Sequence, residues 1–512
     1  MKCFLMYRDC DFVLTKPSTT RELGLIKDLE LEILFENMAA GDAFLREVAE
    51  SAIVCGLAEP NDVTYRQRVL IDCLDHPVIV REMYSIALEA LERERKVWGW
   101  LMSKDPQGVL YRSVEVIQAF LEPLDRLRVL AESSRGLLTS EGFTRLADRI
   151  AKELRPETLQ SIQHHLKTLS FRHGIVVDAG LGLGNHPDAF VVQEPPVDSG
   201  SWLDWLREWF DGLLGSGRET RVYTIDDRDE SGSRALSALK GRALIYIATV
   251  LARSTEHIRS FLVSLRMELG FYLGCLNLKE ELTRRQGAFC FPRPVGWDEQ
   301  AFSAAGLYDI CLLLNGCTEI VSNDVTADSK DLVVITGANR GGKSTFLRSV
   351  GLIQIMMQAG MFVPARSLRL SMCRHLFTHF RREEDATLQR GRFDEELSRM
   401  SSIIDHMRTG DMILLNESFA ATNQREGAEL AGGVIKALLD SGVRVFYVTH
   451  MVDLARAFHH ENAGDTLFLR AQRLADGTRT FRLEEAAPES TSHAADLYRR
   501  VFESGGIQEK SM

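Results

Sequence analysis

One glycine-rich segment, Thr336–Thr345, has residue types suited to binding phosphate groups. Its sequence, TGANRGGKST, places Gly337, Gly342, Lys343 and Ser344 in the spacing GxxxxGK[ST]. Glycines allow a tight turn whose backbone N–H groups point inward, and a following helix adds its N-terminal dipole. The lysine ammonium would reach the β- and γ-phosphates of a nucleotide, and the serine hydroxyl would bind Mg²⁺. The pattern therefore predicts a site for ATP and Mg²⁺.

The flanks of this segment agree with that interpretation. An apolar, β-branched run at 332–335 precedes it, and good helix formers follow it from Thr345 to Gly360. A glycine turn that precedes a helix by chance is the alternative, and it would leave the fit of both flanks unexplained. The residues expected to contact the cofactor are Gly337, Ala338, Asn339, Arg340, Gly341, Gly342, Lys343, Ser344 and Thr345.

Two downstream strands end in side chains that could complete such a site. The stretch Asp411–Glu417, DMILLNE, is an apolar strand that ends in an acid, and Val445–His450, VFYVTH, ends in a histidine. Glu417 could polarise the attacking water, and His450 could sense the γ-phosphate. Asn416 could hold Mg²⁺ by accepting a hydrogen bond from a metal-bound water. Strand, acid, loop, helix, strand and histidine in this order are typical of an ABC-type ATPase.

The segment Ile335–Ala365 resembles the P-loop and following helix of the MutS family of mismatch-repair ATPases. It carries a TGPN-type loop with a doubled glycine, and its helix closes on a Gly-x-x-Val-Pro-Ala turn at 360–365. Asn323 and Asp324 match a residue pair that the family has before this strand. The likeness is strong over about Leu307–Leu454 and rests on helix pattern alone elsewhere.

This resemblance implies a multidomain α and α/β protein. A helical core with a long lever helix and a small β insertion would be followed by an ABC-type P-loop ATPase domain. The resemblance also implies a homodimer joined through its ATPase domains, in which the nucleotide state opens and closes helical arms around DNA in repair or recombination. The alternative is an ABC-like ATPase, or a nucleotide-controlled scaffold, that acts on protein partners without DNA.

Three positions bear on how closely the family's chemistry carries over. Asn416 stands where most such ATPases have Asp, which predicts weaker metal binding and slow hydrolysis, or nucleotide binding without hydrolysis. In 388–400, LQRGRFDEELSRM, a Gly-Arg pair stands where the family has a Ser-Thr pair that contacts the partner's γ-phosphate. We expect Arg390 or Arg392 to supply charge across the dimer, as an arginine finger does. Thr422 matches the family in a loop that normally crosses to the other subunit.

The composition is that of a soluble globular protein with room for several domains. The 512 residues are 45% hydrophobic and 26% charged, and nine scattered cysteines favour buried thiols over bridges. The formal net charge of −11 argues against strong static DNA binding, because a sequence-specific DNA reader is usually basic. The longest apolar run, Ala243–Ala252, is too short to cross a bilayer, and the charged N-terminus does not fit a signal peptide. We therefore expect a cytoplasmic protein without membrane contact.

Changes of pattern along the chain predict four parts. They are a helical core at 1–172, a small β-containing insertion and linker at 173–230, a long lever-like helix at 231–290, and the ATPase domain with its C-terminal tail at 291–512. Apolar residues recur at helical spacing from 231 to 281, unless a break at Gly270 or Gly274 divides that helix. The long helix fits a plain core helix as well as a lever.

Proline, glycine and aromatic positions predict further elements. The helical pattern begins at Arg21 and continues past Leu34, and later helices are punctuated at Pro77, Pro123, Gly136 and Pro156. A hairpin is expected in the tail, at 466–473 and 478–484. A tryptophan stripe at 202–209 fits either a partner or membrane surface, or packing within its own domain.

Two features of the MutS family have no counterpart in this pattern. Nothing ahead of the helical core resembles the mismatch-reading domain with its Phe-x-Glu motif, and the tail after His450 is too short for a nuclease-like domain. We therefore expect DNA binding without mismatch specificity of its own.

Overall fold

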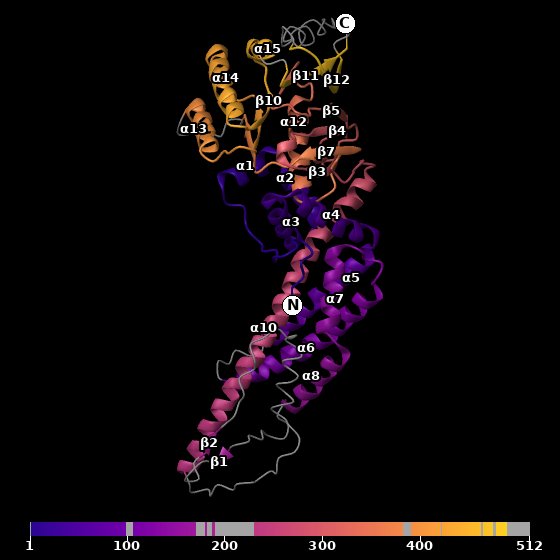
Figure 1. The fold of residues 1–512 in the computed structure, drawn as a ribbon, viewed down its shortest axis with the longest axis vertical. Coiled ribbons are helices and arrows are strands. Elements are labelled where there is room, and N and C mark those ends of the chain that lie inside the picture. The colour runs from indigo at the N-terminus through magenta and orange to yellow at the C-terminus, as the bar shows by residue number, and fades with distance from the viewer. Residues whose placement is uncertain are drawn as a thin grey trace, which may run out of the picture. The chain divides into compact units, whose positions relative to one another are not determined.

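In the computed structural model the chain forms two compact units. The described residues are 2–98, 106–169, 180–181, 187–189, 230–381, 391–420, 422–461, 464–474 and 478–488. One unit, the helical unit, consists of Met1–Val13 and Ile71–Tyr272. The other, the sheet unit, consists of Leu14–Leu70 and Leu273–Met512. Residues 14–70, which the sequence pattern groups with the helical core, thus belong to the same unit as the glycine-rich loop (Figure 1).

The helical unit is built from amphipathic helices whose apolar faces pack together. Its elements are the end of α4 (Pro60–Asp75), α5 (Pro77–Trp98), α6 (Pro106–Ser133), α7 (Glu141–Glu153), α8 (Pro156–Leu169), the first part of α10 (Glu230–Arg284), and the short antiparallel strands β1 (Gly180–Leu181) and β2 (Pro187–Ala189).

The predicted interruption at Pro77 is confirmed, because α5 begins there. The predicted boundary at Pro123 is wrong, since that proline lies inside α6. Packing of α6 against α5, α7 and α8 outweighs the hydrogen bond that a proline removes.

The long helix α10 runs without a break through both Gly270 and Gly274. At Gly274 an added Cβ would lie 3.2 Å from the Met38 Cε atom, so the missing side chain allows close packing inside the sheet unit. Within Ile247–Arg284, an 18-residue window with a mean hydropathy of 1.3 is apolar enough to cross a membrane by length and composition. However, 72% of that window is buried within the protein, a pattern also found in core helices of soluble proteins.

One buried carboxyl ties the N-terminal arm to α10 inside the helical unit. The Glu268 Oε2 atom accepts hydrogen bonds from the Leu5 N–H at 2.5 Å and the Met6 N–H at 3.0 Å. The Tyr272 hydroxyl donates to the Leu5 carbonyl at 2.6 Å. Burial raises the pKa of Glu268 to about 7, although the Met6 and Leu5 N–H groups act in the opposite direction.

The sheet unit has three layers around a six-stranded sheet of order β12-β11-β6-β10-β9-β8. Its strands are β6 (Leu332–Thr336), β8 (Leu376–Phe380), β9 (Met412–Asn416), β10 (Arg444–Val448), β11 (Thr466–Arg473) and β12 (Arg479–Glu485). All neighbours pair in parallel except β11 with β12. The predicted tail hairpin is confirmed by this antiparallel pair.

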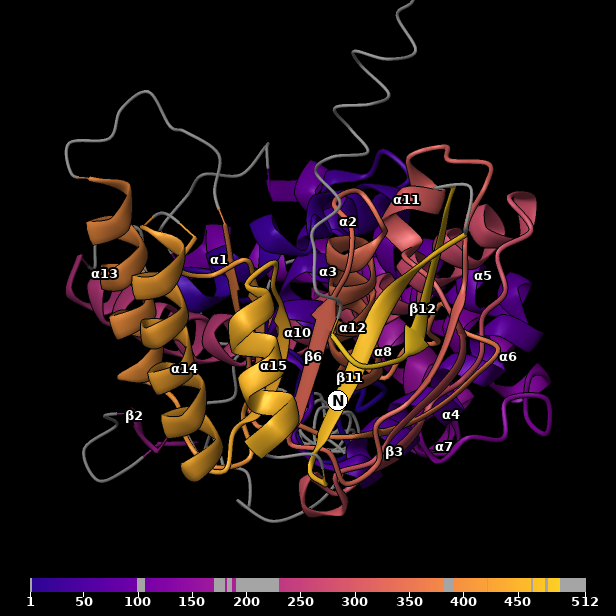
Figure 2. The same cartoon turned by 90° about the horizontal axis from the view of Figure 1, so that it is seen from above.

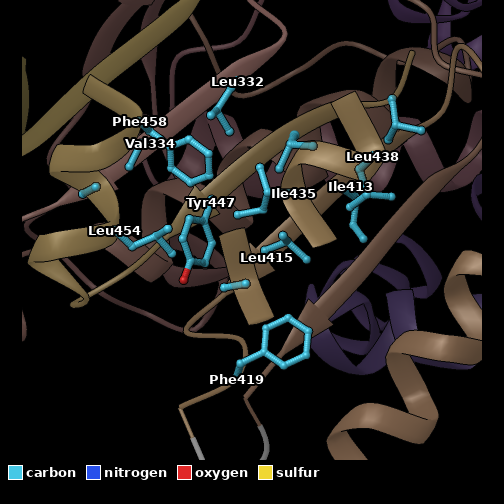
Figure 3. Packing of buried hydrophobic residues seen from close by; sticks show 14 of the residues in the cluster. Leu332, Val334, Ile413, Leu415, Phe419, Ile435, Leu438, Tyr447, Leu454 and Phe458 are labelled. Atoms are coloured by element: carbon cyan, nitrogen blue, oxygen red, sulfur yellow. The ribbon is translucent and has the colours of Figure 1, made fainter. Parts of the chain in front are cut away.

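Helices cover both faces of this sheet because its strands are apolar on both sides. On one face lie α13 (Arg392–Ile404), α14 (Gln424–Asp440) and α15 (Val452–Glu461), and Figure 2 shows α14 and α15 side by side. Their side chains and alternate strand residues form one buried cluster, which Figure 3 shows around Tyr447, Leu415 and Ile435. Burying each large apolar side chain contributes roughly 1.5–3 kcal/mol.

The opposite face packs against α12 (Lys343–Gln358). At Gly351 an added Cβ would lie 2.8 Å from the Leu414 Cδ1 atom and 2.6 Å from the Leu29 Cδ2 atom. Helix α12 therefore sits too close to β9, and to the chain just after α1, for any side chain at this position.

The remaining elements of the sheet unit surround this core. They are α1 (Thr20–Asp28), α2 (Leu31–Ala39), α3 (Ala43–Cys55), α11 (Ile310–Leu314), the 3-10 helix η1 (Trp297–Glu299), and a four-stranded sheet of order β3-β7-β4-β5 made from β3 (Arg293–Val295), β4 (Phe302–Leu307), β5 (Asn323–Thr326) and β7 (Ser367–Ser371). The helical pattern expected from Arg21 onward is divided into α1 and α2. Glu30 has φ of 55° there, a left-handed conformation that interrupts a right-handed helix.

Several expected elements fall outside the described residues. They are the tryptophan stripe at 202–209 and most of the β-containing insertion and linker expected at 173–230.

A change of one atom at Glu268 tests its electrostatic role. In Glu268→Gln the side-chain carbonyl still accepts hydrogen bonds from the Leu5 and Met6 N–H groups, but the amide does not titrate. The folded pKa of about 7 exceeds the unfolded value of 4.5, so the native state binds the proton more tightly. Stability from this group is therefore complete below about pH 4.5 and is lost as the pH rises through 7.

We expect the free energy of unfolding of the wild type to fall relative to Glu268→Gln by at most about 1.4 kcal/mol per pH unit across this window. Urea unfolding followed by circular dichroism, at matched pH values, measures the difference. Parallel stability profiles for the two proteins would contradict the assignment.

Candidate functional site

The carboxyl ends of the parallel strands converge on one edge of the large sheet. In the register of the sheet Val448 pairs with both Ile335 and Asn416, and Phe380 pairs with Asn416. The residues that follow these positions therefore leave the sheet at the same level. This brings the glycine-rich loop, Glu417 and His450 to one edge, which is where parallel α/β sheets place their ligands.

The glycine-rich loop joins the buried strand β6 to the start of α12 at Lys343. Gly337 has φ of 112° and Gly342 has φ of 91°, conformations that favour glycine. An added Cβ at Gly337 would lie 2.9 Å from the Ala471 Cβ atom, and one at Gly341 would lie 2.8 Å from it. The loop therefore passes so close to β11 that neither of these two positions has room for a side chain. The predicted strand, loop and helix are all present.

The other loop residues differ in exposure and backbone strain. Asn339 and Arg340 are exposed, while Ala338 is buried. Arg340 has φ of 59°, which is unusual for a residue with a side chain. Ser344 and Thr345 follow Lys343 in the first turn of α12, where backbone N–H groups have no helical acceptor.

The ammonium group of Lys343 is held inside the loop. Its Nζ atom donates to the Gly337 carbonyl at 2.8 Å and to the Ala338 carbonyl at 3.1 Å. Burial lowers the pKa of Lys343, the Glu417 carboxylate opposes that shift, and Arg479 adds to it. Among the described residues the hydrogen bonds of this buried cation go to neutral carbonyls, so a bound anion would stabilise its charge further.

Two uncharged oxygens meet next to this lysine. The Ser344 hydroxyl donates to the Asn416 Oδ1 atom at 2.9 Å, which joins the start of α12 to the end of β9. Hydroxyl and amide oxygens are hard ligands that suit Mg²⁺. Within the described ranges no group of three or more His, Cys, Asp or Glu is placed to hold a metal ion.

Glu417 leaves β9 in a strained conformation. Its φ is 53°, and its N–H donates to the Val448 carbonyl at 2.9 Å. Its carboxylate is 24% exposed and lies 3.5 Å from the Arg381 Nη1 atom. Backbone strain of about 1–3 kcal/mol persists only where the surroundings enforce it, and it is common at functional positions.

A buried network behind Glu417 enforces that conformation. The His379 Nδ1 atom lies 2.7 Å from the Ser418 hydroxyl oxygen, and that hydroxyl donates to the His379 carbonyl at 3.0 Å. The Phe419 N–H donates to the Glu396 Oε1 atom of α13 at 2.5 Å. An added Cβ at Gly427 would lie 2.4 Å from the Phe419 carbonyl oxygen. The loop after Glu417 is thus held by β8, α13 and α14 together.

No sequence pattern marks His379 as functional, because a lone histidine in an apolar strand is usually a core residue. Glu396 lies within the segment 388–400, and it accepts a hydrogen bond from a backbone N–H of its own chain. The predicted γ-phosphate sensor, His450, is half-buried and follows Thr449, whose N–H donates to the Ile335 carbonyl at 3.1 Å. His450 therefore lies at the same sheet edge as the glycine-rich loop.

The three residues expected to act across a dimer are described to different extents. Arg390 lies outside the described residues. Arg392 begins α13, and only its backbone position is described. The Thr422 hydroxyl donates to the Glu426 carboxylate at 2.9 Å, so in this chain it stabilises the start of α14.

A cavity of about 750 Å³ adjoins the glycine-rich loop through β12. Phe481 lies against the loop, with its carbonyl oxygen 3.3 Å from the Cβ position of Gly342, and the next two residues line the cavity. The Leu483 N–H donates to the Asn323 Oδ1 atom at 2.7 Å, which fixes one wall. The cavity is also lined by Tyr308, Ile320 and Arg366. It has the size of a small-molecule site, and sequence patterns did not reveal it.

These observations define a glycine-rich loop between a parallel strand and a helix, with a buried lysine and a serine–asparagine hydrogen bond beside it. Family comparisons match the MutS2 N-terminal domain at residues 58–285 and MutS domain V at residues 333–493. Together the two matched ranges include well over half of the 512 residues. The chain belongs to the MutS family, as its loop and flanking turn predicted.

Similar curated proteins carry the same family name. The DNA mismatch repair protein MutS of Myxococcus xanthus is 32% identical over 219 residues, which is 38% of this chain and 24% of that protein. The DNA mismatch repair protein MutS of Thermotoga maritima is 36% identical over 141 residues, 27% of this chain and 18% of that protein. A probable DNA mismatch repair protein Msh6 of Drosophila melanogaster is 35% identical over 136 residues, 27% of this chain and 11% of that protein. The chain thus spans a quarter or less of the length of these relatives.

Two glycines of the same helix test how tightly the loop after Glu417 is held. In Gly427→Ala the new methyl group would overlap the Phe419 carbonyl oxygen, which should lower the free energy of unfolding by about 1–3 kcal/mol. At Gly433 nothing lies within 4 Å of the added Cβ. Gly433→Ala should therefore raise stability by up to about 1 kcal/mol through helix propensity.

Thermal unfolding midpoints of the two variants and the wild type make the comparison. Equal midpoints for Gly427→Ala and Gly433→Ala would show that the loop can shift freely.

Proposed function

We propose that this chain binds and slowly hydrolyses ATP with Mg²⁺ in an ABC-type P-loop domain. The observation that carries the proposal is the Ser344–Asn416 hydrogen bond beside the buried Lys343, because it brings a cation position and a phosphate position together. The backbone fits a phosphate chain, since side chains are excluded at Gly337 and Gly341.

Each residue of the site has a role in this proposal. The Lys343 ammonium neutralises the phosphates, and the N–H groups of the loop orient them. Ser344 binds Mg²⁺ directly and Asn416 binds it through water; the metal, when bound, stabilises charge on the phosphate oxygens. Glu417 orients and deprotonates the attacking water, and His450 contacts the γ-phosphate from the neighbouring strand.

Asn416 makes slow turnover the expected behaviour. An amide oxygen can accept a hydrogen bond from metal-bound water but adds no negative charge, whereas the Asp of most such ATPases does. The next residue, Glu417, has a carboxylate, but its proposed role as the base competes with metal binding.

The biological role that we propose is that of a DNA-binding, nucleotide-controlled dimeric clamp in DNA repair or recombination. The names of the similar proteins support DNA as the partner. Homodimerisation through the ATPase domains would add a positive charge from Arg390 or Arg392 to the partner's nucleotide. We further propose that α10 acts as a lever between the predicted core at 1–172 and the ATPase domain at 291–512, and that the protein works in the cytoplasm.

Two substitutions separate nucleotide binding from hydrolysis. Lys343→Ala should weaken ATP binding at least about tenfold because it removes the cation of the loop. Glu417→Gln should bind ATP normally and hydrolyse it roughly a hundredfold more slowly, since an amide cannot accept the proton. Binding is measured by fluorescence anisotropy of a labelled ATP analogue, and hydrolysis by phosphate release.

The matched control is Glu429→Gln, a side chain of α14 that is 71% exposed and pairs only with Arg425. It should leave both quantities unchanged. Unaltered ATP affinity in Lys343→Ala, or wild-type turnover in Glu417→Gln, would overturn the proposed site.

DNA dependence distinguishes the clamp from its alternative. We expect duplex DNA to raise the rate of ATP hydrolysis, and we expect retention on DNA to fall steeply with salt because phosphate contacts release counterions. Homoduplex, mismatched and branched DNA should be compared, with similar stimulation expected from matched and mismatched duplexes. A rate and a retention that no DNA changes would favour an ATPase or scaffold that acts on protein partners.

A further inference from the structure

A second cavity of the sheet unit lies away from the nucleotide site. It has a volume of about 620 Å³ and is enclosed by the first turns of α1, the edge strand β8 and the end of α13. Ligand pockets of proteins typically measure about 300–1,000 Å³, so this cavity has room for a small molecule. None of the residues that line it belongs to the glycine-rich loop or to the strand ends around it.

The walls of this cavity are basic, although the chain as a whole carries a net charge of −11. Its ionisable lining residues are Arg21, Arg399, Arg408, His375, His406 and the single acid Asp28. The nearby acids Glu22 and Asp411 are engaged: Glu22 accepts from the Ser18 and Thr19 N–H groups, and Asp411 accepts from the N–H groups of His375 and Arg408. Arginines from three separate segments therefore line one space: Arg21, which pairs with Glu22 at 3.7 Å, Arg399 and Arg408.

One of these cations is fixed in place before any ligand arrives. The Arg399 Nη2 atom donates to the Phe380 carbonyl at 2.5 Å, and the side chain is half-buried. A guanidinium held in this way loses little conformational freedom on binding an anion.

A buried hydroxyl in the wall has no hydrogen-bond partner. Thr378 of β8 is 7% exposed, and its Oγ1 atom is buried without a partner among the described residues. That atom faces α1, because it lies 3.9 Å from the Cβ position of Gly24, and both residues line the cavity. Leaving such a donor unsatisfied costs about 1–3 kcal/mol, which a ligand oxygen would recover.

The floor of the cavity is apolar. Phe377 and Ile403 line it and belong to the buried cluster that covers the large sheet. A simple inorganic anion would leave this surface in contact with water, whereas a ligand with an apolar part would cover it.

We propose that this cavity is a binding site for a small organic anion, in which a phosphate or carboxylate group is joined to an apolar ring or chain. The anionic group contacts Arg399, Arg408 and the Thr378 hydroxyl, and the apolar part lies on Phe377 and Ile403. This site is independent of the nucleotide site.

Phenyl phosphate, benzoate and uncharged phenol are suitable probes, measured by isothermal titration calorimetry on the full chain. We expect one or both anions to bind and phenol to bind at least about tenfold more weakly. The preferred anion identifies the ligand as a phosphate or a carboxylate. Equal binding of phenol, or no binding of either anion, would overturn the proposal.

Variants locate the binding to this cavity. Thr378→Val keeps the shape of the side chain and removes the hydroxyl, so affinity should fall about tenfold while the unfolding midpoint does not drop. Gly24→Leu fills the cavity from a helix position where a larger residue is favoured, so it should abolish binding. Arg408→Gln, at an exposed residue, should weaken binding without affecting folding.

Two controls separate this site from others. Lys343→Ala should leave binding of the probes unchanged, which distinguishes the cavity from the phosphate loop. Arg425→Gln removes an arginine side chain that is 90% exposed and lies outside the cavity, and it should also have no effect. Probe binding that persists in Gly24→Leu, or that disappears in Lys343→Ala, would contradict the assignment.

Discussion

The parallel register of β6, β10 and β9 is the constraint on which the site depends. Because Val448 is opposite both Ile335 and Asn416, the chain leaves all three strands at one level. The Ser344 hydroxyl can then reach the Asn416 amide oxygen across the sheet edge. A shift of one residue in any of these strands would turn its buried side chains to the opposite face, so the apolar core itself protects the geometry of the site.

Around this edge the chain accepts unfavourable local conformations. Arg340, Glu417 and Phe419 all have positive φ, at about 1–2 kcal/mol each. Phe419 offsets part of this cost because its ring is 1% exposed within the buried cluster and its N–H is bound by Glu396. Helix α13 therefore has two roles: its first half fixes the loop that bears Glu417, and its last turns form a wall of the basic cavity.

Much of the nucleotide-loop region could be predicted from sequence because its signals are local. An apolar strand, a GxxxxGK[ST] loop and a helix need only neighbouring residues to specify them, and so does the hairpin of β11 and β12. The long helix α10 could also be predicted, because apolar residues recur along its length at helical spacing.

Features that depend on distant contacts could not be read in this way. The junction of α1 and α2 and the continuation of α6 through Pro123 are decided by packing, which overrides local preference. The bond from His379 to Ser418 and the unpartnered Thr378 hydroxyl join elements far apart in sequence. Neither cavity has a sequence signature, because each is enclosed by segments separated by many residues.

A crystal structure of the Glu417→Gln chain with Mg²⁺ and ATP would show directly whether the glycine-rich loop binds the nucleotide. We expect phosphates within the loop from Gly337 to Lys343, with the Lys343 ammonium moved from the loop carbonyls to a phosphate oxygen. We also expect Mg²⁺ at about 2.1 Å from the Ser344 hydroxyl oxygen, with a bound water next to Asn416. Phosphates bound elsewhere, or a metal ion that contacts neither residue, would contradict the proposed site.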